Sequence, residues 1–138
     1  MPTINPYLNF SDTCEEAFNF YKSVFGGEFQ TVMRYSDGPP EMAGDGNEAN
    51  KIIHIALPIG SSGVLMGSDR PASFGPATPG DFSVMFGAES EEEGSRIYTD
   101  LSAGGQVIMP YAKAFWGSYF GMFRDKFGTQ WMVSYDPK

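Results

Sequence analysis

The sequence has one cysteine, one histidine and no long apolar run. The lone Cys14 cannot form an internal disulfide, which agrees with a reducing compartment. No apolar stretch approaches the roughly 20 residues that cross a bilayer. Residues 1–5 also lack the basic and apolar regions of a secretory signal. We therefore expect a cytoplasmic protein with no membrane partner.

Positive charge is also scarce. Nine lysines and arginines stand against 17 aspartates and glutamates, which gives a formal net charge of −8. The basic residues are scattered rather than clustered. Such a surface repels phosphate backbones, so we exclude nucleic acid and anionic membranes as partners. The partner classes that remain are a small molecule and another protein.

The chain has enough apolar material for one domain. Its 138 residues are 41% hydrophobic and 15% aromatic, and a chain of this length can bury a core without disulfides. The 17 glycines and 10 prolines make up about a fifth of the residues, below the proportion typical of disordered chains. We expect them in turns.

Two amphipathic helices are predicted. The first spans residues 12–25, where apolar residues recur every three or four positions. A capping pair, Asp12 and Glu15, marks its start, and Gly26 and Gly27 end it. Cys14 lies on its apolar stripe beside acidic residues that oppose a thiolate, so we interpret it as a packing thiol and not as a nucleophile.

The second helix repeats the first. Ser90–Glu93 forms a capping box, and residues 104–105 are again two glycines. Shifting the chain by 78 residues places residues 4–10 on 82–88 and 26–27 on 104–105. This pattern is typical of an internal duplication.

Short β-branched and aromatic runs surround each helix, so each half predicts strand, helix and three further strands. The expected strands are residues 4–10, 28–35, 51–59, 64–68, 82–87, 106–112, 118–123 and 130–135. We predict a single α+β domain over residues 1–138, with modules at 1–69 and 80–138, a Pro-rich connector at 70–79 and a long exposed loop at 36–50. One helix covers only one face of a sheet, so the other face of each module needs a cover. We therefore expect the two modules to curl into an eight-stranded mixed sheet with the helices outside. The concave side of this sheet would form a ligand cleft.

Motifs throughout the chain carry a family resemblance. They are Pro6–Phe10, Cys14–Phe18, Phe25–Gly27, Val64–Asp69, Phe115–Gly117, Tyr119–Gly121 and Asp125–Gly128 with Gln130–Met132. Together with the duplicated modules they resemble the PhnB-like branch of the vicinal oxygen chelate superfamily, which contains glyoxalase I, extradiol dioxygenases and bleomycin-resistance proteins. The resemblance implies a homodimer. Members of the branch are often labelled 3-demethylubiquinone 3-methyltransferase, but no Gly-rich turn opens a helix here to hold S-adenosylmethionine, so we reject that chemistry.

The superfamily's enzymes bind a divalent metal through His, Gln or Glu on the first and last strands of the two modules. In this sequence those strands contain neither histidine nor carboxylate. Asn, Ser and Gln alone make a poor metal cage, so we predict no metal site and no cofactor. We also find no basic cluster that would mark a phosphonate site.

His54 is the one candidate catalytic residue. It lies in a strand that is apolar on both faces, where a structural role is common, although an imidazole can also serve as a general base without metal. Both interpretations stay open.

A pocket of methionines and aromatic residues with a few polar groups is expected on the inner strand faces, and Met132 adds to its apolar part. A slip of one residue in strand phase would reverse these faces. The predicted ligand-binding residues are Tyr7, Asn9, His54, Met66, Ser68, Ser83, Met85, Trp116, Tyr119 and Trp131.

The acidic residues are given no such role. We interpret Glu89 with Glu91–Glu93, and Glu41, Asp45 and Glu48, as solvated. Asp69 and Asp125 lie in turns, where short carboxylates bind backbone N–H groups.

The resemblance, taken with these residues, implies three alternative functions. The first is a metal-free member of the superfamily that binds a small organic ligand. The second is a metal-dependent lyase, isomerase or dioxygenase that uses His54. The third is an antibiotic-sequestering protein, for which binding alone suffices.

Overall fold

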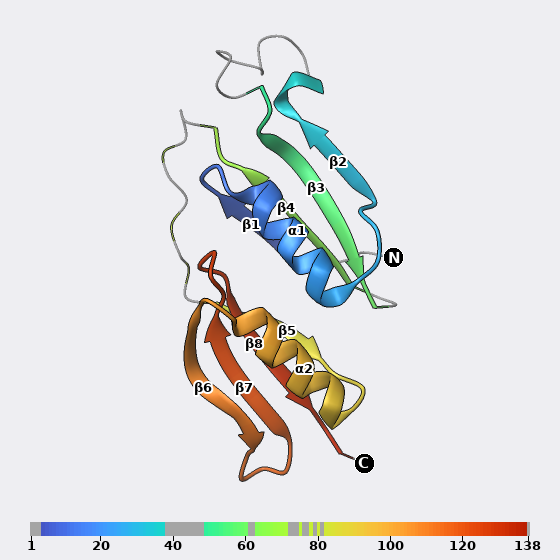
Figure 1. Cartoon of the computed structure of the whole chain (residues 1–138), viewed down its shortest axis with the longest axis vertical. Coiled ribbons are helices and arrows are strands. Elements are labelled where there is room, and N and C mark those ends of the chain that lie inside the picture. Colours follow the sequence, from blue (N-terminus) through green and yellow to red (C-terminus); the bar gives the residue numbers. More distant parts are fainter. Residues whose placement is uncertain are drawn as a thin grey trace. The chain divides into compact units, whose positions relative to one another are not determined.

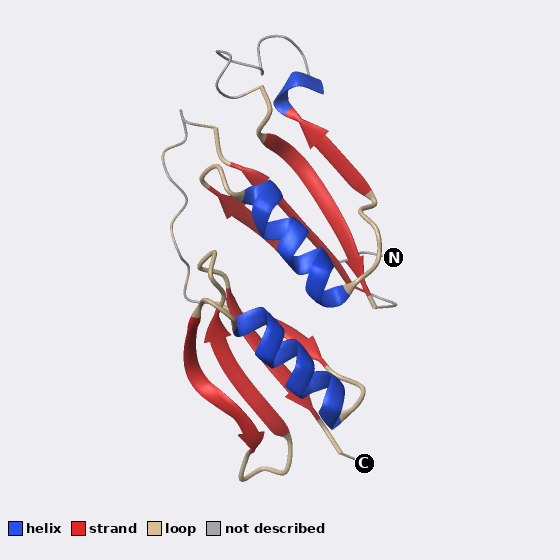
Figure 2. Cartoon of the chain, in the orientation of Figure 1, coloured by secondary structure: helices blue, strands red, loops and turns tan. Residues whose placement is uncertain are grey.

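A computed structural model describes residues 4–37, 49–60, 63–71, 75, 78, 80 and 82–137. The chain divides into two compact units, Met1–Thr78 and Pro79–Lys138. Each unit contains a helix and a sheet (Figure 2). Within the described residues no helix is long and apolar enough to cross a membrane.

The first unit is a four-stranded mixed sheet with one helix on it (Figure 1). Its sheet has the order β1-β4-β3-β2, in which β1 runs parallel to β4 and the other neighbours are antiparallel. A short 3-10 turn, Tyr35–Asp37, follows β2. The elements are β1 (Tyr7–Phe10), α1 (Cys14–Phe25), β2 (Thr31–Arg34), β3 (Ile52–Ile59) and β4 (Gly63–Asp69).

The second unit repeats this topology. Its sheet has the order β5-β8-β7-β6, with β5 parallel to β8 and antiparallel pairing elsewhere. The elements are β5 (Val84–Gly87), α2 (Glu91–Ser102), β6 (Gln106–Lys113), β7 (Tyr119–Arg124) and β8 (Gln130–Tyr135).

The predicted α+β class, both helices and all eight strands are therefore confirmed. The strands form two four-stranded sheets, each with its own hydrogen-bonded ladder. The expected strands at 4–10 and 82–87 begin later, at Tyr7 and Val84. Residues 38–48 of the expected long loop, including Glu41, Asp45 and Glu48, lie outside the described residues, as do 72–74, 76, 77 and 79 of the connector.

The core of each unit lies between the helix and the facing side of the sheet. In the first unit, Phe18 and Tyr21 of α1 are fully buried above Leu57 and Leu65. Gly67 in β4 allows this approach, because a Cβ there would lie 2.7 Å from Phe18 Cε1. The second core contains Ile97 and Leu101 of α2 with Phe123, Trp131 and Val133 of the sheet.

The start of α1 differs from the predicted capping box. Thr13 is the N-cap and makes no side-chain cap, while Asp12 has a positive φ of 77° and pairs with Lys51. The buried Asp69 at the end of β4 takes the capping role instead. Its Oδ1 accepts a hydrogen bond from Cys14 N at 3.0 Å, and its Oδ2 accepts one from Ile52 N at 3.0 Å. One carboxylate therefore joins the helix start to the sheet.

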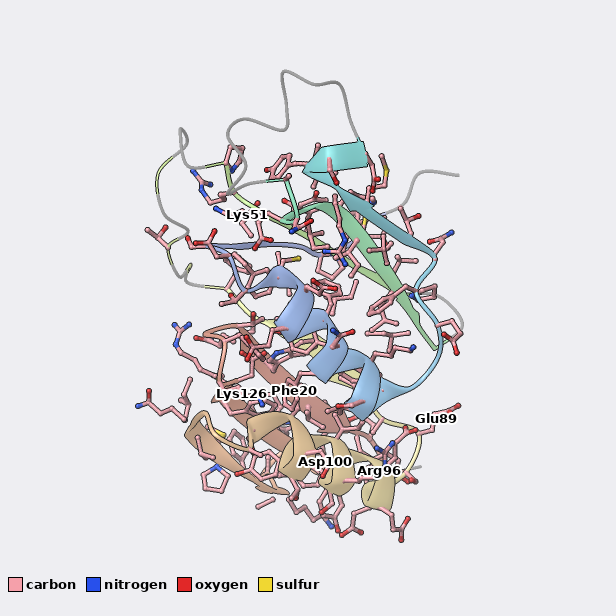
Figure 3. The ribbon with its side chains drawn as sticks, turned by 45° about the horizontal axis from the view of Figure 1, so that its top comes forward. Phe20, Lys51, Glu89, Arg96, Asp100 and Lys126 are labelled. Atoms are coloured by element: carbon pink, nitrogen blue, oxygen red, sulfur yellow. The ribbon has the colours of Figure 1, made fainter. Side chains whose placement is uncertain are left out.

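The predicted Ser90 cap of α2 is confirmed, and the Glu93 side chain reaches back to the residue before the N-cap instead of to Ser90 N. Ser90 Oγ accepts a hydrogen bond from Glu93 N at 3.0 Å, and Glu93 Oε1 accepts one from Glu89 N at 2.8 Å. Figure 3 marks Arg96 and Asp100 further along α2, where their exposed side chains form an ion pair at 3.9 Å. Exposed pairs of this kind add little stability.

Candidate functional site

Each sheet has one face under its helix and one face away from it, which we call the open face. The strand register assigns residues to these faces, because directly paired residues point to the same side and neighbours along a strand alternate. Leu8 and Ile55 both pair with Gly67, which faces Phe18 of α1. The adjacent residues in each strand therefore lie on the open face.

Five predicted ligand-binding residues share the open face of the first sheet. The register pairs Tyr7 with Met66 and Asn9 with Ser68, while His54 of β3 pairs with Met33. β3 is an inner strand, which places His54 in the middle of this face.

Tyr7 and His54 contact one another across β4. Their rings stack with centroids 5.8 Å apart and an interplanar angle of 23°. The Tyr7 hydroxyl lies 3.4 Å from His54 Nδ1, a long hydrogen bond. Tyr7 is 44% exposed, so the pair is open to solvent. A ligand with a planar ring and a polar edge can stack on these two side chains and form a hydrogen bond with them.

Four methionines cross the open face of the second sheet. Met85 pairs with Met132, Met132 with Met122, and Met122 with Met109, so that each strand supplies one. We call this set the methionine row. Ser83 lies beside it, and its Oγ accepts a hydrogen bond from Gln130 Nε2 at 2.5 Å.

Aromatic side chains extend this face at the β6–β7 turn. Trp116 contacts Phe120 with centroids 5.9 Å apart, and Phe120 pairs in register with Ser134 next to the methionine row. Trp116 is 54% exposed and its neighbour Phe115 is 98% exposed. Trp116 therefore lies where a bound molecule can reach it.

Trp131 lies on the opposite face from the predicted one. It is 1% exposed in the core beneath α2, and its Nε1 donates a hydrogen bond to Asp125 Oδ2 at 2.8 Å. Because its indole is enclosed, we remove Trp131 from the candidate site. The predicted backbone role of Asp125 is confirmed, since its Oδ1 accepts hydrogen bonds from Phe127 N and Thr129 N.

Tyr119 also lies on the α2 side. It pairs with Tyr135, which is on the same face as buried Val133, and its ring contacts Tyr111. The Tyr111 hydroxyl is buried with no hydrogen-bond partner among the described residues, close to Gly94 of α2. Burial, followed by the charge of Glu91 and the neighbouring tyrosines, raises the pKa of Tyr111. We therefore also leave Tyr119 out of the candidate site.

Comparison with known proteins fits this arrangement. Residues 3–133 match the Glyoxalase/Bleomycin resistance protein/Dioxygenase superfamily. The chain belongs to this superfamily. It is 29% identical to Protein YjdN of Escherichia coli (strain K12) over 140 residues, which cover 95% of this chain and 93% of YjdN.

Two solved structures support the same conclusion. The crystal structure of protein PA1353 from Pseudomonas aeruginosa is 34% identical, with a TM-score of 0.90 over 100% of both chains. The PhnB protein from Bacillus cereus, a putative 3-demethylubiquinone-9 3-methyltransferase, is 26% identical, with a TM-score of 0.78 over 97% of this chain and 99% of that chain. The predicted PhnB-like resemblance is thus confirmed at the level of the family and fold.

The donor atoms of the open faces do not fit the divalent metal of the superfamily's enzymes. The site residues of the first open face offer one imidazole from His54, one amide from Asn9, and the hydroxyls of Ser68 and Tyr7. No three His, Cys, Asp or Glu side chains in the described part of the chain come together in a way that could hold a metal. A hard cation needs several oxygens, usually charged, and zinc needs more imidazole or thiolate than is present.

Part of the second open face was not predicted from the sequence. Met109, Met122 and Phe120 are not among the predicted ligand-binding residues. A usable signal was present, because Met85, Met109, Met122 and Met132 each fall on a different predicted strand. All six methionines of the described residues lie outside the buried core, which is unusual for a side chain that commonly fills core gaps.

Cys14 is a packing thiol, as predicted. It is 0% exposed, and burial, with the nearby Asp69 and Glu15 charges, raises the pKa of its thiol. We expect it to react with a disulfide reagent at least about a hundredfold more slowly in the folded chain than in urea, because only thiolate reacts. Equal rates in both states would contradict the buried placement.

The same raised pKa fixes the sign of a pH effect. Above the ordinary thiol pKa the unfolded chain loses a proton that folded Cys14 keeps, so the folded state becomes less stable as pH rises. Cys14→Ala removes this contribution. The difference in unfolding free energy between the wild type and Cys14→Ala should therefore change only at pH values above the ordinary thiol pKa.

Proposed function

We propose that each sheet of this protein offers its open face to small, largely apolar organic ligands, and that these bind without a metal. The observation that carries the proposal is the placement of the methionines. Thioether side chains are flexible and polarisable, so they adapt to ligands of different shape. The methionine row, together with Trp116, supplies such a surface.

The open face of the first sheet has polar groups of its own in the Tyr7–His54 pair. Ligand sites are typically apolar with a few polar groups that fix orientation. The phenol hydroxyl and the imidazole offer both a donor and an acceptor near Asn9 and Ser68. For this face we therefore favour a planar molecule with one or two hydrogen-bonding groups at its edge.

A thermal-shift screen of planar organic compounds tests this proposal. We expect hits that raise the melting temperature and that lose at least about tenfold in affinity in Met85→Lys, which places a charge in the methionine row. Ser95→Lys is the matched control, because Ser95 is exposed on α2. A library that never shifts the melting temperature, or hits equally weakened by both variants, would refute the proposal.

Metal-dependent catalysis through His54 is the alternative to exclude. Elemental analysis for Mn, Fe, Co, Ni, Cu and Zn on protein purified without chelator separates the two. We expect no stoichiometric metal in the wild type or in His54→Ala. A metal present in the wild type and lost in the variant would favour a lyase, isomerase or dioxygenase.

We also propose that the protein is a homodimer. Support comes from membership of the superfamily and from exposed apolar side chains, among which Phe82 is 66% and Phe115 98% exposed. Light scattering on the same samples should give twice the chain mass of 15.1 kDa. A species of the chain mass alone would contradict it. We place this dimer in the cytoplasm, which cell fractionation checks.

A further inference from the structure

We infer that the methionine row is a site of thioether oxidation by peroxides, which turns the open face of the second sheet from apolar to polar while the unit stays folded. The inference concerns a modification of this face and does not need a bound ligand to be tested. Its consequence for ligand affinity rests on the proposed function.

The register brings the four thioethers together. Directly paired residues of adjacent strands have Cα atoms roughly 4.5–5.5 Å apart, so neighbouring sulfurs share one patch. Met85 is 63% exposed and Met109 is 44% exposed, while Met122 and Met132 of the inner strands are half-buried. Because the row lies away from α2, a small oxidant reaches it without opening the core.

The core of the second unit contains no thioether among its described residues. Its buried side chains include Ile97, Leu101, Phe123, Trp131 and Val133, none of which a mild peroxide converts. Methionine oxidation commonly disrupts proteins by placing a polar sulfoxide in a core. Here the new polar group is formed at the solvent side of the sheet.

A hydrogen-bond donor already lies beside Met122, where it can bind the sulfoxide that oxidation forms. Gln130 Nε2 lies 3.9 Å from Met122 Sδ, and its amide has a second N–H besides the one directed to Ser83. A thioether is a weak acceptor, whereas a sulfoxide oxygen is a strong one. Oxidation of Met122 would therefore exchange a weak contact for a better hydrogen bond.

The chemistry balances with hydrogen peroxide as the oxidant. A sulfur lone pair attacks one peroxide oxygen, the O–O bond breaks and an S–O bond forms. Sulfur loses two electrons, the peroxide is reduced, and the departing hydroxide takes up the remaining proton to give water. Each event adds one oxygen, about 16 Da, and sulfoxide reductases can reverse it.

Peptide mapping by mass spectrometry after treatment of the native protein with hydrogen peroxide tests the inference. We expect Met85 and Met109 to oxidise first, and Met122 and Met132 to follow within about tenfold of their rates in the urea-unfolded chain. The fluorescence of buried Trp131 and the far-ultraviolet circular dichroism should keep their folded values throughout.

Two results would overturn it. One is protection of Met122 and Met132 by more than about a hundredfold, which is the behaviour of core residues. The other is oxidation that proceeds only as the folded signals disappear. The variant Met122→Leu with Met132→Leu serves as control, because its mass increase on the second sheet should fall by two oxygens while its folded signals are unchanged. The oxidation rates and the folded signals do not depend on a ligand, so they test this inference even if the thermal-shift screen finds none.

Discussion

Gly105→Ala is expected to destabilise the second unit by about 3 kcal/mol, as measured by denaturant unfolding. Gly105 lies between α2 and β6, against the turn that follows β7. A Cβ at this position would lie 2.1 Å from the Arg124 carbonyl oxygen and 2.8 Å from the Asp125 carbonyl carbon. Both are backbone atoms, so the clash is relieved only if the turn moves. Both tryptophans, Trp116 and Trp131, belong to this unit, so their fluorescence reports its unfolding directly.

Gly87→Ala is the matched control. Gly87 lies in β5, where an added Cβ would have no heavy atom within 4 Å, and neither glycine has a positive φ. The two substitutions therefore reduce the freedom of the unfolded chain equally and differ only in the clash. We expect Gly87→Ala to change stability by less than about 1 kcal/mol. Similar losses in both variants would show that the close approach at Gly105 is not what matters.

Asp125→Ala should cost the second unit about 3 kcal/mol by the same measurement. The Asp125 carboxylate is buried and accepts hydrogen bonds from Phe127 N at 2.9 Å, Thr129 N at 3.0 Å and Trp131 Nε1 at 2.8 Å. Without the carboxylate, the buried indole N–H of Trp131 loses this acceptor. The N–H groups of Phe127 and Thr129 in the turn lose it as well. A buried donor left unpaired loses more than an ordinary hydrogen bond contributes.

A double-mutant cycle isolates the indole contribution. We expect Asp125→Ala to cost at least about 1 kcal/mol less in a Trp131→Phe background, because phenylalanine has no N–H to leave unpaired. Asp100→Ala, at an exposed position on α2, should stay within about 0.5 kcal/mol of the wild type. Equal costs of Asp125→Ala in both backgrounds would remove the indole from the explanation.

The fold could be predicted from the sequence because its signals are local. Periodicity and paired glycines indicated both helices, and the box at Ser90 needs residues only three apart. The start of α1 could not be predicted in this way. Its cap is Asp69, which is 55 residues from Cys14 along the chain, so only the assembled sheet brings the two together.

Site residues could be predicted in strands where polar and apolar residues alternate, but not in strands whose two faces are both apolar. Tyr7 with Asn9, and Met66 with Ser68, are spaced by two residues and fall on one face. In β8 the buried Trp131 is next to Met132, and both are large and apolar. Which of them faces the helix depends on the packing of α2, because the indole fits beneath it with Asp125 as partner. Whether the open-face residues touch a ligand stays a prediction.

The outermost strand of the second sheet carries a protection against aggregation. β6 is eight residues long, forms an edge, and exposes Val107 and Ile108, which are features that invite another chain to add a strand. Pro110 interrupts it by removing one backbone donor, and its register shifts between Val107 and Met109 and again between Met109 and Ala112. Such an irregular edge is a poor template for a continuous ladder, which opposes the addition of a strand from another chain at this apolar rim.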